Sequence, residues 1–223
     1  MRKHRYTQQQ VDQITIAGRV IPTRSVFSVA SNDVDFTTRI GCGVQIWQYR
    51  LWMNMLNRCY SSKHQKAYPS YKGVIVCDEW LSFGNFLEWC NKEVGYKGKP
   101  AGMCLDKDII ELGNTVYCPQ RCSFVPEEVN LLLMENSSRR GIYPVGVNYH
   151  KATGKFVAQI SCQDAPKHLG VFSSADDAFS VYKVAKENQI EEVVFRNQKH
   201  LRPDVRNALL RLRVNKSGLY REE

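Results

Sequence analysis

The sequence lacks long apolar stretches. No run approaches the roughly 20 apolar residues that a membrane-spanning helix needs, so we expect no membrane partner. The N-terminal stretch MRKHRYTQQQVDQ is basic and then polar, without the apolar segment of a secretory signal. These two absences predict a cytoplasmic protein.

Paired cysteine motifs are also missing. The 8 cysteines are scattered along the chain and include no Cys-x-x-Cys pair. In a reducing cytoplasm, a disulfide framework is not expected for a chain of 223 residues. The rest of the composition is ordinary, with 43% hydrophobic and 24% charged residues, and is sufficient for a packed core.

What the sequence does have is positive charge. Lys and Arg number 31 against 22 Asp and Glu, a net charge of +9. In a chain of ordinary composition this favours a polyanionic partner, most simply nucleic acid. The alternative is a protein with a basic bias and no such partner.

Hydrophobic patterns divide the chain into four parts. Residues 1–43 are polar with weak alternation, and we interpret them as an N-terminal arm. Residues 44–136 form a first module. It holds a helix starting near Val44, a loop at 61–73, and a second helix at 81–92 capped by Ser82. A linker at 135–141 leads to a second module at 137–200, and 201–223 are interpreted as a basic C-terminal helix or tail.

The second module changes from helical to alternating patterns. Strands are predicted at about 144–151, 155–162 and 167–172, followed by a helix that Ser174 caps. The sequence thus predicts an α+β fold with a three-stranded antiparallel sheet packed on a helix. Residues 137–223 carry 15 Lys and Arg against 9 Asp and Glu, which favours this part as the unit that binds a phosphate backbone.

Alternation also assigns the two faces of the predicted sheet. Phe156, Ala158 and Ile160 share the side facing the helix. Amides on the other face can read base edges, and cations there can hold phosphates; the alternative is a solvated sheet face. The candidate DNA-binding residues, with rim and linker cations included, are Asn148, His150, Lys151, Lys155, Gln159, Ser161, Lys167, Arg139 and Arg140.

Four pieces of this module carry a resemblance: Gly-Val at 146–147, Gly-Lys-Phe at 154–156, Leu-Gly-Val-Phe at 169–172 and the Ala-x-x-x-Tyr of 178–182. In this order and spacing they resemble the three-stranded DNA-binding module of plant ethylene-response factors, which also occurs at the C-termini of phage and bacterial homing endonucleases. The resemblance covers about 145–190 and implies double-stranded DNA as partner, with the open sheet face in the major groove. Several of the positions that face the DNA are arginines in the plant proteins but not in this chain. We therefore expect this module to recognise a different DNA sequence.

The stretch LDKDIIELGNTVYCPQRCSFVPEEVN, residues 105–130, carries a second resemblance. Together with upstream pieces from Trp52 to Phe86, it is similar to phage-encoded HNH (His-Me finger) endonucleases over about 47–134. That family implies a ββα-metal-like module, with a first strand at 105–109, a turn at Gly113–Asn114 and a helix at 126–134. It implies hydrolysis of DNA phosphodiester bonds with Mg²⁺ or Mn²⁺, and a cytoplasmic location in the bacterial host.

The family's functional residues carry over only in part. Asp106 matches the acidic metal ligand and Asn130 the helix ligand, while Lys107 stands where the general-base His is expected. Arg121 stands near the position of the central structural Asn. None of the 5 histidines lies in the motif. His64 is in a loop of the same module, distant from the motif in sequence, and could approach it only if the fold brings the two together.

The missing His leaves the function open. A lysine next to Asp106 and Asp108 has carboxylates that favour its charged form, so Lys107 suits phosphate binding better than proton abstraction. Asp108 or a metal-bound hydroxide is the substitute base in an active enzyme. The alternatives are a catalytically inactive DNA-binding protein derived from an HNH endonuclease, and a virion or host-interaction protein.

Zinc is a second candidate metal. Some HNH proteins brace this hairpin with four cysteines, and thiolates bind zinc well. The candidate ligands of a structural Zn²⁺ here are Cys59, Cys77, Cys118 and Cys122. The alternative is that these cysteines are simply buried.

Overall fold

The structure is a computed structural model that describes residues 7–11, 24–40, 43–94, 101–133, 142–162 and 165–222. The chain has a mixed α+β fold made of small sheets and divides into two compact units. Unit 1 comprises residues 1–107 and 113–124, and unit 2 comprises 108–112 and 125–223. The predicted linker at 135–141 lies outside the described residues. No helix in the described ranges is both long and apolar enough to cross a membrane.

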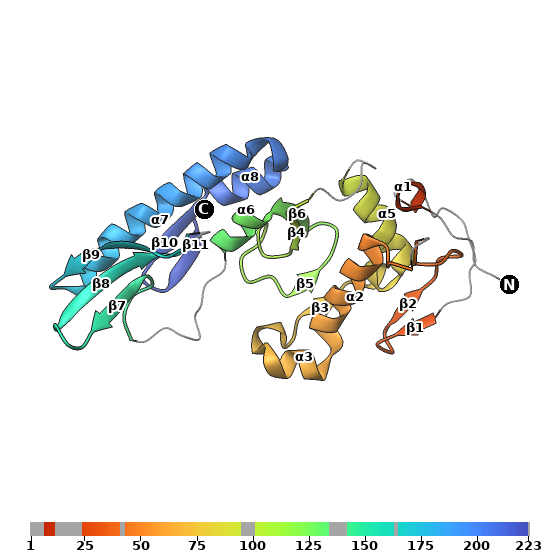
Figure 1. Ribbon diagram of the computed structural model, residues 1–223, viewed down its shortest axis with the longest axis horizontal. Helices are drawn as coiled ribbons and strands as arrows, with labels where there is room; N and C mark the ends of the chain where they lie inside the picture. Colours follow the sequence, from red (N-terminus) through yellow and green to blue (C-terminus); the bar gives the residue numbers. More distant parts are fainter. Residues whose placement is uncertain are drawn as a thin grey trace. The chain divides into compact units, whose positions relative to one another are not determined.

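Unit 1 consists mostly of short helices (Figure 1). Their apolar side chains meet in one core. On α2, Trp52, Met55 and Cys59 are buried at helical spacing, as the sequence predicts. Ser82 caps α5 by accepting a hydrogen bond from the backbone N–H of Asn85, which confirms the predicted helix start. The helices of this unit are α1 (Gln8–Val11), α2 (Trp47–Tyr60), α3 (Ser62–Ala67), η1 (Pro69–Tyr71), α4 (Asp78–Leu81) and α5 (Phe83–Glu93).

Short strands complete this unit. β1 (Arg24–Val26) and β2 (Ala30–Asn32) form a hairpin, and β3 (Ile75–Val76) pairs in parallel with β5 (Val116–Tyr117). β4 (Met103–Asp106) pairs with β6 (Ser123–Pro126), so the first strand of the expected hairpin is paired across a long loop. The predicted N-terminal arm contributes buried side chains to the core, among them Val11 and Phe36. The segment 61–73, expected to be a loop, contains α3 and η1.

Unit 2 is organised by one long helix, α7 (Ala175–Asn197). Its first half packs on the antiparallel sheet β7 (Val147–His150), β8 (Lys155–Ile160) and β9 (Lys167–Phe172). Its second half packs with α6 (Glu127–Leu132) and α8 (Pro203–Leu210) (Figure 1). Ser174 caps α7 by accepting from the backbone N–H groups of Asp176 and Asp177, as predicted.

The chain ends differently from the prediction. The C-terminal helix stops at Leu210, and the chain continues as a hairpin of β10 (Leu212–Asn215) and β11 (Gly218–Arg221). Asn215 shapes the turn, because its side-chain oxygen accepts from the backbone N–H groups of Ser217 and Gly218. The short η3 (Gln198–His200) precedes α8. The hairpin adds Val214 to the core under the sheet.

One glycine allows the sheet to approach its helix closely, and a second shapes the turn between two strands. Gly146 has a φ of +75°, and a β-carbon there would lie 2.0 Å from Cδ2 of Tyr182. The Tyr182 ring therefore packs directly on the backbone that enters β7. Gly154, with a φ of +66°, sits in the tight turn between β7 and β8. These positions belong to three of the four sequence pieces that suggested the module.

Candidate functional site

The open face of the β7–β8–β9 sheet collects most of the predicted DNA-binding side chains. In the strand register, Asn148 pairs with Val157 and His150 with Lys155, while Val147 pairs with Ala158. Val147, Ala158 and Ile160 are buried on the helix side. The neighbouring residues in each strand therefore point to the other side, as the alternation predicts. This outward set is named the sheet face; its members are Asn148, His150, Lys155, Val157, Gln159, His168 and Val171.

Exposure agrees with this assignment. Asn148, His150 and Lys155 are exposed, whereas Gln159 is half-buried. Ser161 and Lys151 are exposed at the ends of strands. Lys167 is exposed as well, but it pairs with Ile160, so its alternation places it with the helix side. Arg139 and Arg140 lie outside the described residues.

His168 and Val171 belong to the sheet face although the sequence analysis did not select them. A register shift between Ala158 and Gln159 brings His168 opposite Gln159. Both His168 and Val171 are exposed. For Val171 the signal was present in the sequence, because Gly170 and Phe172 mark the inward positions of β9. The same alternation would place His168 inward. A shift inside a strand, however, is not visible in alternation alone.

Hydrogen bonds hold two of the nitrogen-bearing side chains of the sheet face. His150 Nδ1 lies 2.9 Å from Thr153 Oγ1, and Lys155 Nζ donates to Ser173 Oγ at 2.9 Å. Both partners are neutral, so the positive charge of Lys155 is not cancelled by them. Cations placed in this way can meet phosphate groups without first breaking an ion pair.

The loop between β4 and β6 is the second candidate site. Asp106 is buried at the end of β4, and Lys107 is half-buried after it. Lys107 Nζ donates to the backbone oxygen of Asn114, which ties the lysine into the loop. The Asn114 side chain, 3% exposed, donates to the carbonyl oxygens of Lys107 at 2.8 Å and Val116 at 2.7 Å.

Asn114 also binds the other side of the loop, where Arg121 lies. Its Oδ1 accepts from the backbone N–H of Val116 at 3.0 Å and from Arg121 Nη1 at 3.1 Å. Arg121 is thus a hydrogen-bond partner of Asn114, and its match to the family's central asparagine stays a prediction. The sequence analysis saw Asn114 only as a turn residue.

The other two residues that the resemblance selected belong to unit 2. Asp108 and Asn130 are half-buried, and Asn130 lies on α6. Arg221 holds the segment that contains Asp108, because its guanidinium donates to the backbone oxygens of Ile109 and Ile110. Of the two expected metal ligands, Asp106 falls in unit 1 and Asn130 in unit 2. The metal site therefore remains a prediction.

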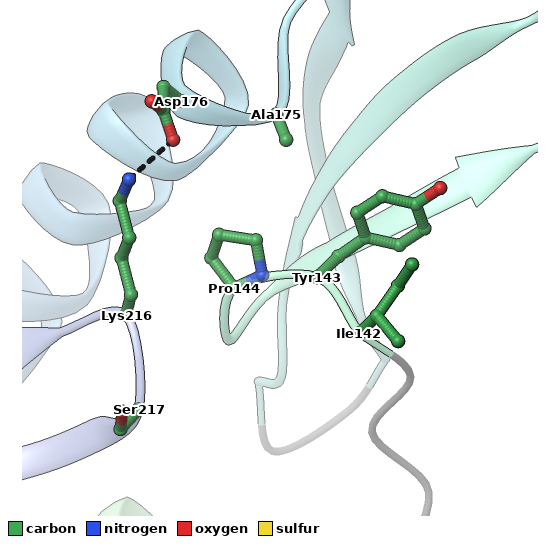
Figure 2. Close-up of a pocket in the computed structure, with 7 residues that line it drawn as sticks. All are labelled: Ile142, Tyr143, Pro144, Ala175, Asp176, Lys216 and Ser217. Carbon is green, nitrogen blue, oxygen red and sulfur yellow. Dashed lines mark hydrogen bonds and ion pairs between the residues drawn. The ribbon is translucent and has the colours of Figure 1, made fainter.

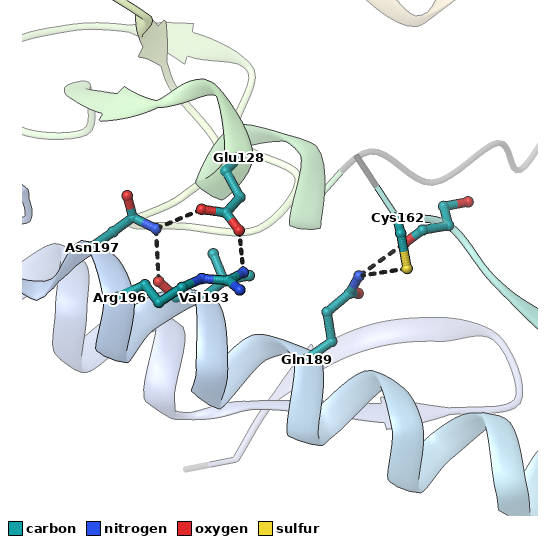
Figure 3. A network of polar contacts seen from close by, with 7 residues as sticks. Glu128, Cys162, Gln189, Val193, Arg196 and Asn197 are labelled. Carbon is teal, nitrogen blue, oxygen red and sulfur yellow. Dashed lines mark hydrogen bonds and ion pairs between the residues drawn. The ribbon is translucent and has the colours of Figure 1, made fainter. Parts of the chain in front are cut away.

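Helix α6 is fixed to α7 by a polar network (Figure 3). Glu128 accepts from Arg196 and, at 2.9 Å, from Asn197 Nδ2. Further along α7, Gln189 Nε2 donates to the backbone oxygen of Ser161 at 2.8 Å, at the end of β8. The same helix thus holds the sheet at one position and α6 at another.

The four candidate zinc ligands all lie in unit 1. Burial raises the pKa of the Cys59 thiol to about 12, against the opposing effect of Lys107 and Arg58. Burial also raises the pKa of Cys77 and Cys122. Over the described ranges, no three His, Cys, Asp or Glu side chains are grouped so as to hold a metal. The zinc site therefore remains a prediction from the sequence.

The distribution of charge changes with the observed unit boundaries. Unit 1 has 16 Lys and Arg against 8 Asp and Glu, whereas unit 2 has 15 against 14. The segments 108–112 and 125–136 bring 5 carboxylates into unit 2. The excess of positive charge expected for the C-terminal part is therefore found in unit 1. The argument that the β7–β8–β9 sheet binds a phosphate backbone depends on the residues of the sheet itself and not on the net charge of unit 2.

A pocket of about 570 Å³ opens beside the start of α7, in unit 2 (Figure 2). Ile142, Tyr143 and Pro144 form one wall, and the turn of the β10–β11 hairpin forms another. Of the lining residues, Asp176 and Lys216 are charged, and they pair with each other at 2.6 Å. None of the predicted site residues lines this pocket.

Comparison of the chain with protein families, with curated proteins and with solved structures gave no match.

Proposed function

We propose that the protein binds double-stranded DNA through the sheet face. The observation that carries this proposal is the composition of the three strands and the turn at 151–154, which contain no Asp or Glu and place Lys155 on the sheet face and Lys151 directly after β7. Amide side chains at Asn148 and Gln159 supply donors and acceptors of the kind that read base edges. The lysines supply charge for phosphates.

The dimensions of the sheet support the same partner. Neighbouring strands lie about 4.8 Å apart, so three strands span about 10 Å between the outer two. The major groove of B-DNA is about 12 Å wide. A sheet of this width can enter the groove with its polar face toward the bases.

Charge also differs between the sheet and the long helix of unit 2. The three strands and the turn at 151–154 have cations and no carboxylates, whereas α7 carries five carboxylates against three Lys and Arg residues. The excess of carboxylates lies in the half of α7 that packs with α6 and α8, so a phosphate backbone is favoured at the sheet and not at that end of the helix.

A matched pair of lysine variants tests this proposal. Lys155→Ala removes a charge from the sheet face, and Lys183→Ala removes one from α7. We expect Lys155→Ala to weaken duplex binding and to reduce the slope of log K against log salt by about 1. Lys183→Ala should leave both quantities unchanged. Equal effects of the two variants in a fluorescence anisotropy titration would contradict the proposal.

Metal-dependent cleavage of the bound DNA is a second candidate function. It is favoured by the order β4, β6, α6, with Asp106 at the end of β4 and Asn130 on the helix that follows β6. Carboxylate and amide oxygens suit Mg²⁺ or Mn²⁺, and such an ion would supply an activated water and stabilise the developing charge. In this proposal Lys107 and Asp108 contribute to phosphate binding and proton transfer.

Plasmid cleavage separates the two candidates. With Mg²⁺ or Mn²⁺ the wild type should nick supercoiled DNA, and Asp106→Asn, which keeps the size of the side chain, should abolish nicking. Asp78→Asn changes an exposed carboxylate of the same unit and should remain active. If the wild type binds the plasmid but leaves it intact with both metals, the protein is a binding protein without this activity.

A further inference from the structure

We propose that a second surface, on α3 and η1 of unit 1, binds single-stranded nucleic acid by stacking a base on Tyr68. This α3–η1 face consists of Lys63, His64, Lys66, Tyr68, Tyr71 and Lys72. It belongs to the unit that carries the charge excess and is independent of the sheet face.

The first argument is the absence of carboxylates around this face. From Phe36 to Cys77 the sequence contains no Asp or Glu and six Lys and Arg residues. Three of the six, Lys63, Lys66 and Lys72, are exposed on the α3–η1 segment. The first carboxylates that follow are on α4. Such a surface is complementary to a phosphodiester backbone.

The second argument is a stack of rings with one open side. Tyr68 is 56% exposed, although it is a large aromatic side chain. Its ring lies 4.7 Å from the His64 ring at an angle of 30°. His64 in turn lies 5.5 Å from Tyr71, and Arg58 covers Tyr71 at 5.7 Å. The covered side of Tyr68 is thus occupied by His64, and the ring retains exposed surface for a further planar group.

The third argument is that this geometry is fixed before any ligand arrives. Ser61 caps α3 by accepting from the backbone N–H of His64 at 3.2 Å. The backbone N–H of Tyr68 donates to His64 O at 2.8 Å, and that of Tyr71 donates to Tyr68 O at 3.1 Å. Pro69 restricts the backbone directly after Tyr68. A ring held in this way loses little conformational freedom on binding.

These features together select the partner. In a duplex the base faces are covered by their neighbours, so an exposed ring gains little from it. In a single strand the base faces are open, and stacking on aromatic side chains combined with backbone contacts to cations is the usual mode of recognition. An acidic peptide would match the lysines but has no bases to stack on Tyr68.

The test uses the full chain and fluorescently labelled oligothymidine, measured by anisotropy at several salt concentrations. Tyr68→Ala should weaken binding about tenfold, as expected for the loss of one stacked base. Tyr68→Phe keeps the ring and should bind within about twofold of the wild type. Replacing Lys63, Lys66 and Lys72 by Ala should reduce the slope of log K against log salt concentration by about 2, since each phosphate contact to a single strand contributes about 0.7 to that slope. Lys92→Ala, an exposed lysine on α5, is the charge control and should have no effect.

Three outcomes would overturn the proposal. The first is wild-type affinity of Tyr68→Ala for oligothymidine, with folding confirmed by circular dichroism. The second is tighter binding of a duplex of the same length that depends on the same three lysines. The third is displacement of oligothymidine by polyglutamate as effectively as by unlabelled oligothymidine. The Lys155→Ala variant, which tests the sheet face, should bind oligothymidine normally, so failure of either surface is recognised separately.

Discussion

At the scale of single residues, Asn114 organises the loop between β4 and β6. Its amide bonds two backbone carbonyls, one backbone N–H and the Arg121 guanidinium, all from a position that is 3% exposed. A buried amide with this many partners cannot be removed without leaving some of them unsatisfied. The conformation of Lys107 depends on the same residue, because Lys107 bonds the Asn114 carbonyl.

Asn114→Ala should therefore lower the free energy of unfolding by about 2–4 kcal/mol, because the carbonyl groups of two half-buried residues, Lys107 and Val116, lose their donor. Chemical denaturation followed by tryptophan fluorescence measures this. Asn54→Ala, at an exposed position of α2, is the control and should change stability by less than about 0.5 kcal/mol. Equal stability of the two variants would show that Asn114 does not hold the loop.

At the scale of elements, the close contact between β7 and α7 depends on a missing side chain. The Tyr182 ring occupies the space where a β-carbon at Gly146 would lie. Gly154 shares the positive φ, but a β-carbon there would meet only Tyr149 Oη, at 3.9 Å. The two glycines thus have the same backbone requirement and different surroundings.

This difference gives a matched pair of variants. Gly154→Ala should cost about 1 kcal/mol of stability, the penalty for a left-handed backbone with a β-carbon. Gly146→Ala adds displacement of the Tyr182 ring and should cost about 3 kcal/mol or more. Thermal unfolding of both variants measures the difference. Similar melting temperatures would mean that Tyr182 moves aside at little cost.

At the scale of the whole molecule, α7 connects two parts of unit 2. Ala178 and Tyr182 belong to the core under the sheet, whereas Ile190 and Val193 belong to the core with α6 and α8. The buried side of α7 therefore packs against different elements along its length. Because one continuous helix contributes side chains to both cores, we expect the two cores to lose stability together.

Val184→Pro tests this coupling. Val184 is 59% exposed, so the substitution removes little packing and acts mainly by interrupting α7. A proline inside a helix costs about 3 kcal/mol or more. Hydrogen exchange should show faster exchange both in β8 and in α8, while Val184→Ala should leave exchange unchanged. Faster exchange in the sheet alone would mean that the two cores are independent.

The sequence predicted the elements whose patterns are local. Alternation found the three strands of the sheet within a few residues, and cap residues located the starts of α5 and α7. The hairpin after Leu210 was missed because Val205, Leu209 and Leu212 also fit a helical period. Leu212 and Val214 alternate like a strand, but four residues are too few to decide between the two periods.

The candidate sites were predicted to different extents. The sheet face followed from alternation, except for His168, which depends on a register shift. The role of Asn114 depends on its hydrogen bonds to Lys107, Val116 and Arg121. No rule based on sequence spacing predicts these contacts. The ring stack on α3 was missed because residues 61–73 were interpreted as a loop, where side-chain orientation is not periodic.

The continuity of α7 has a consequence for the spacing of the two cores of unit 2. Tyr182 packs under the sheet and Val193 packs with α6, 11 residues further along the helix. At 1.5 Å per residue, the two positions are about 16 Å apart. Because the rise per residue of a helix is fixed, the distance between the two cores is set by the number of residues between these positions and not by the loops that join the other elements.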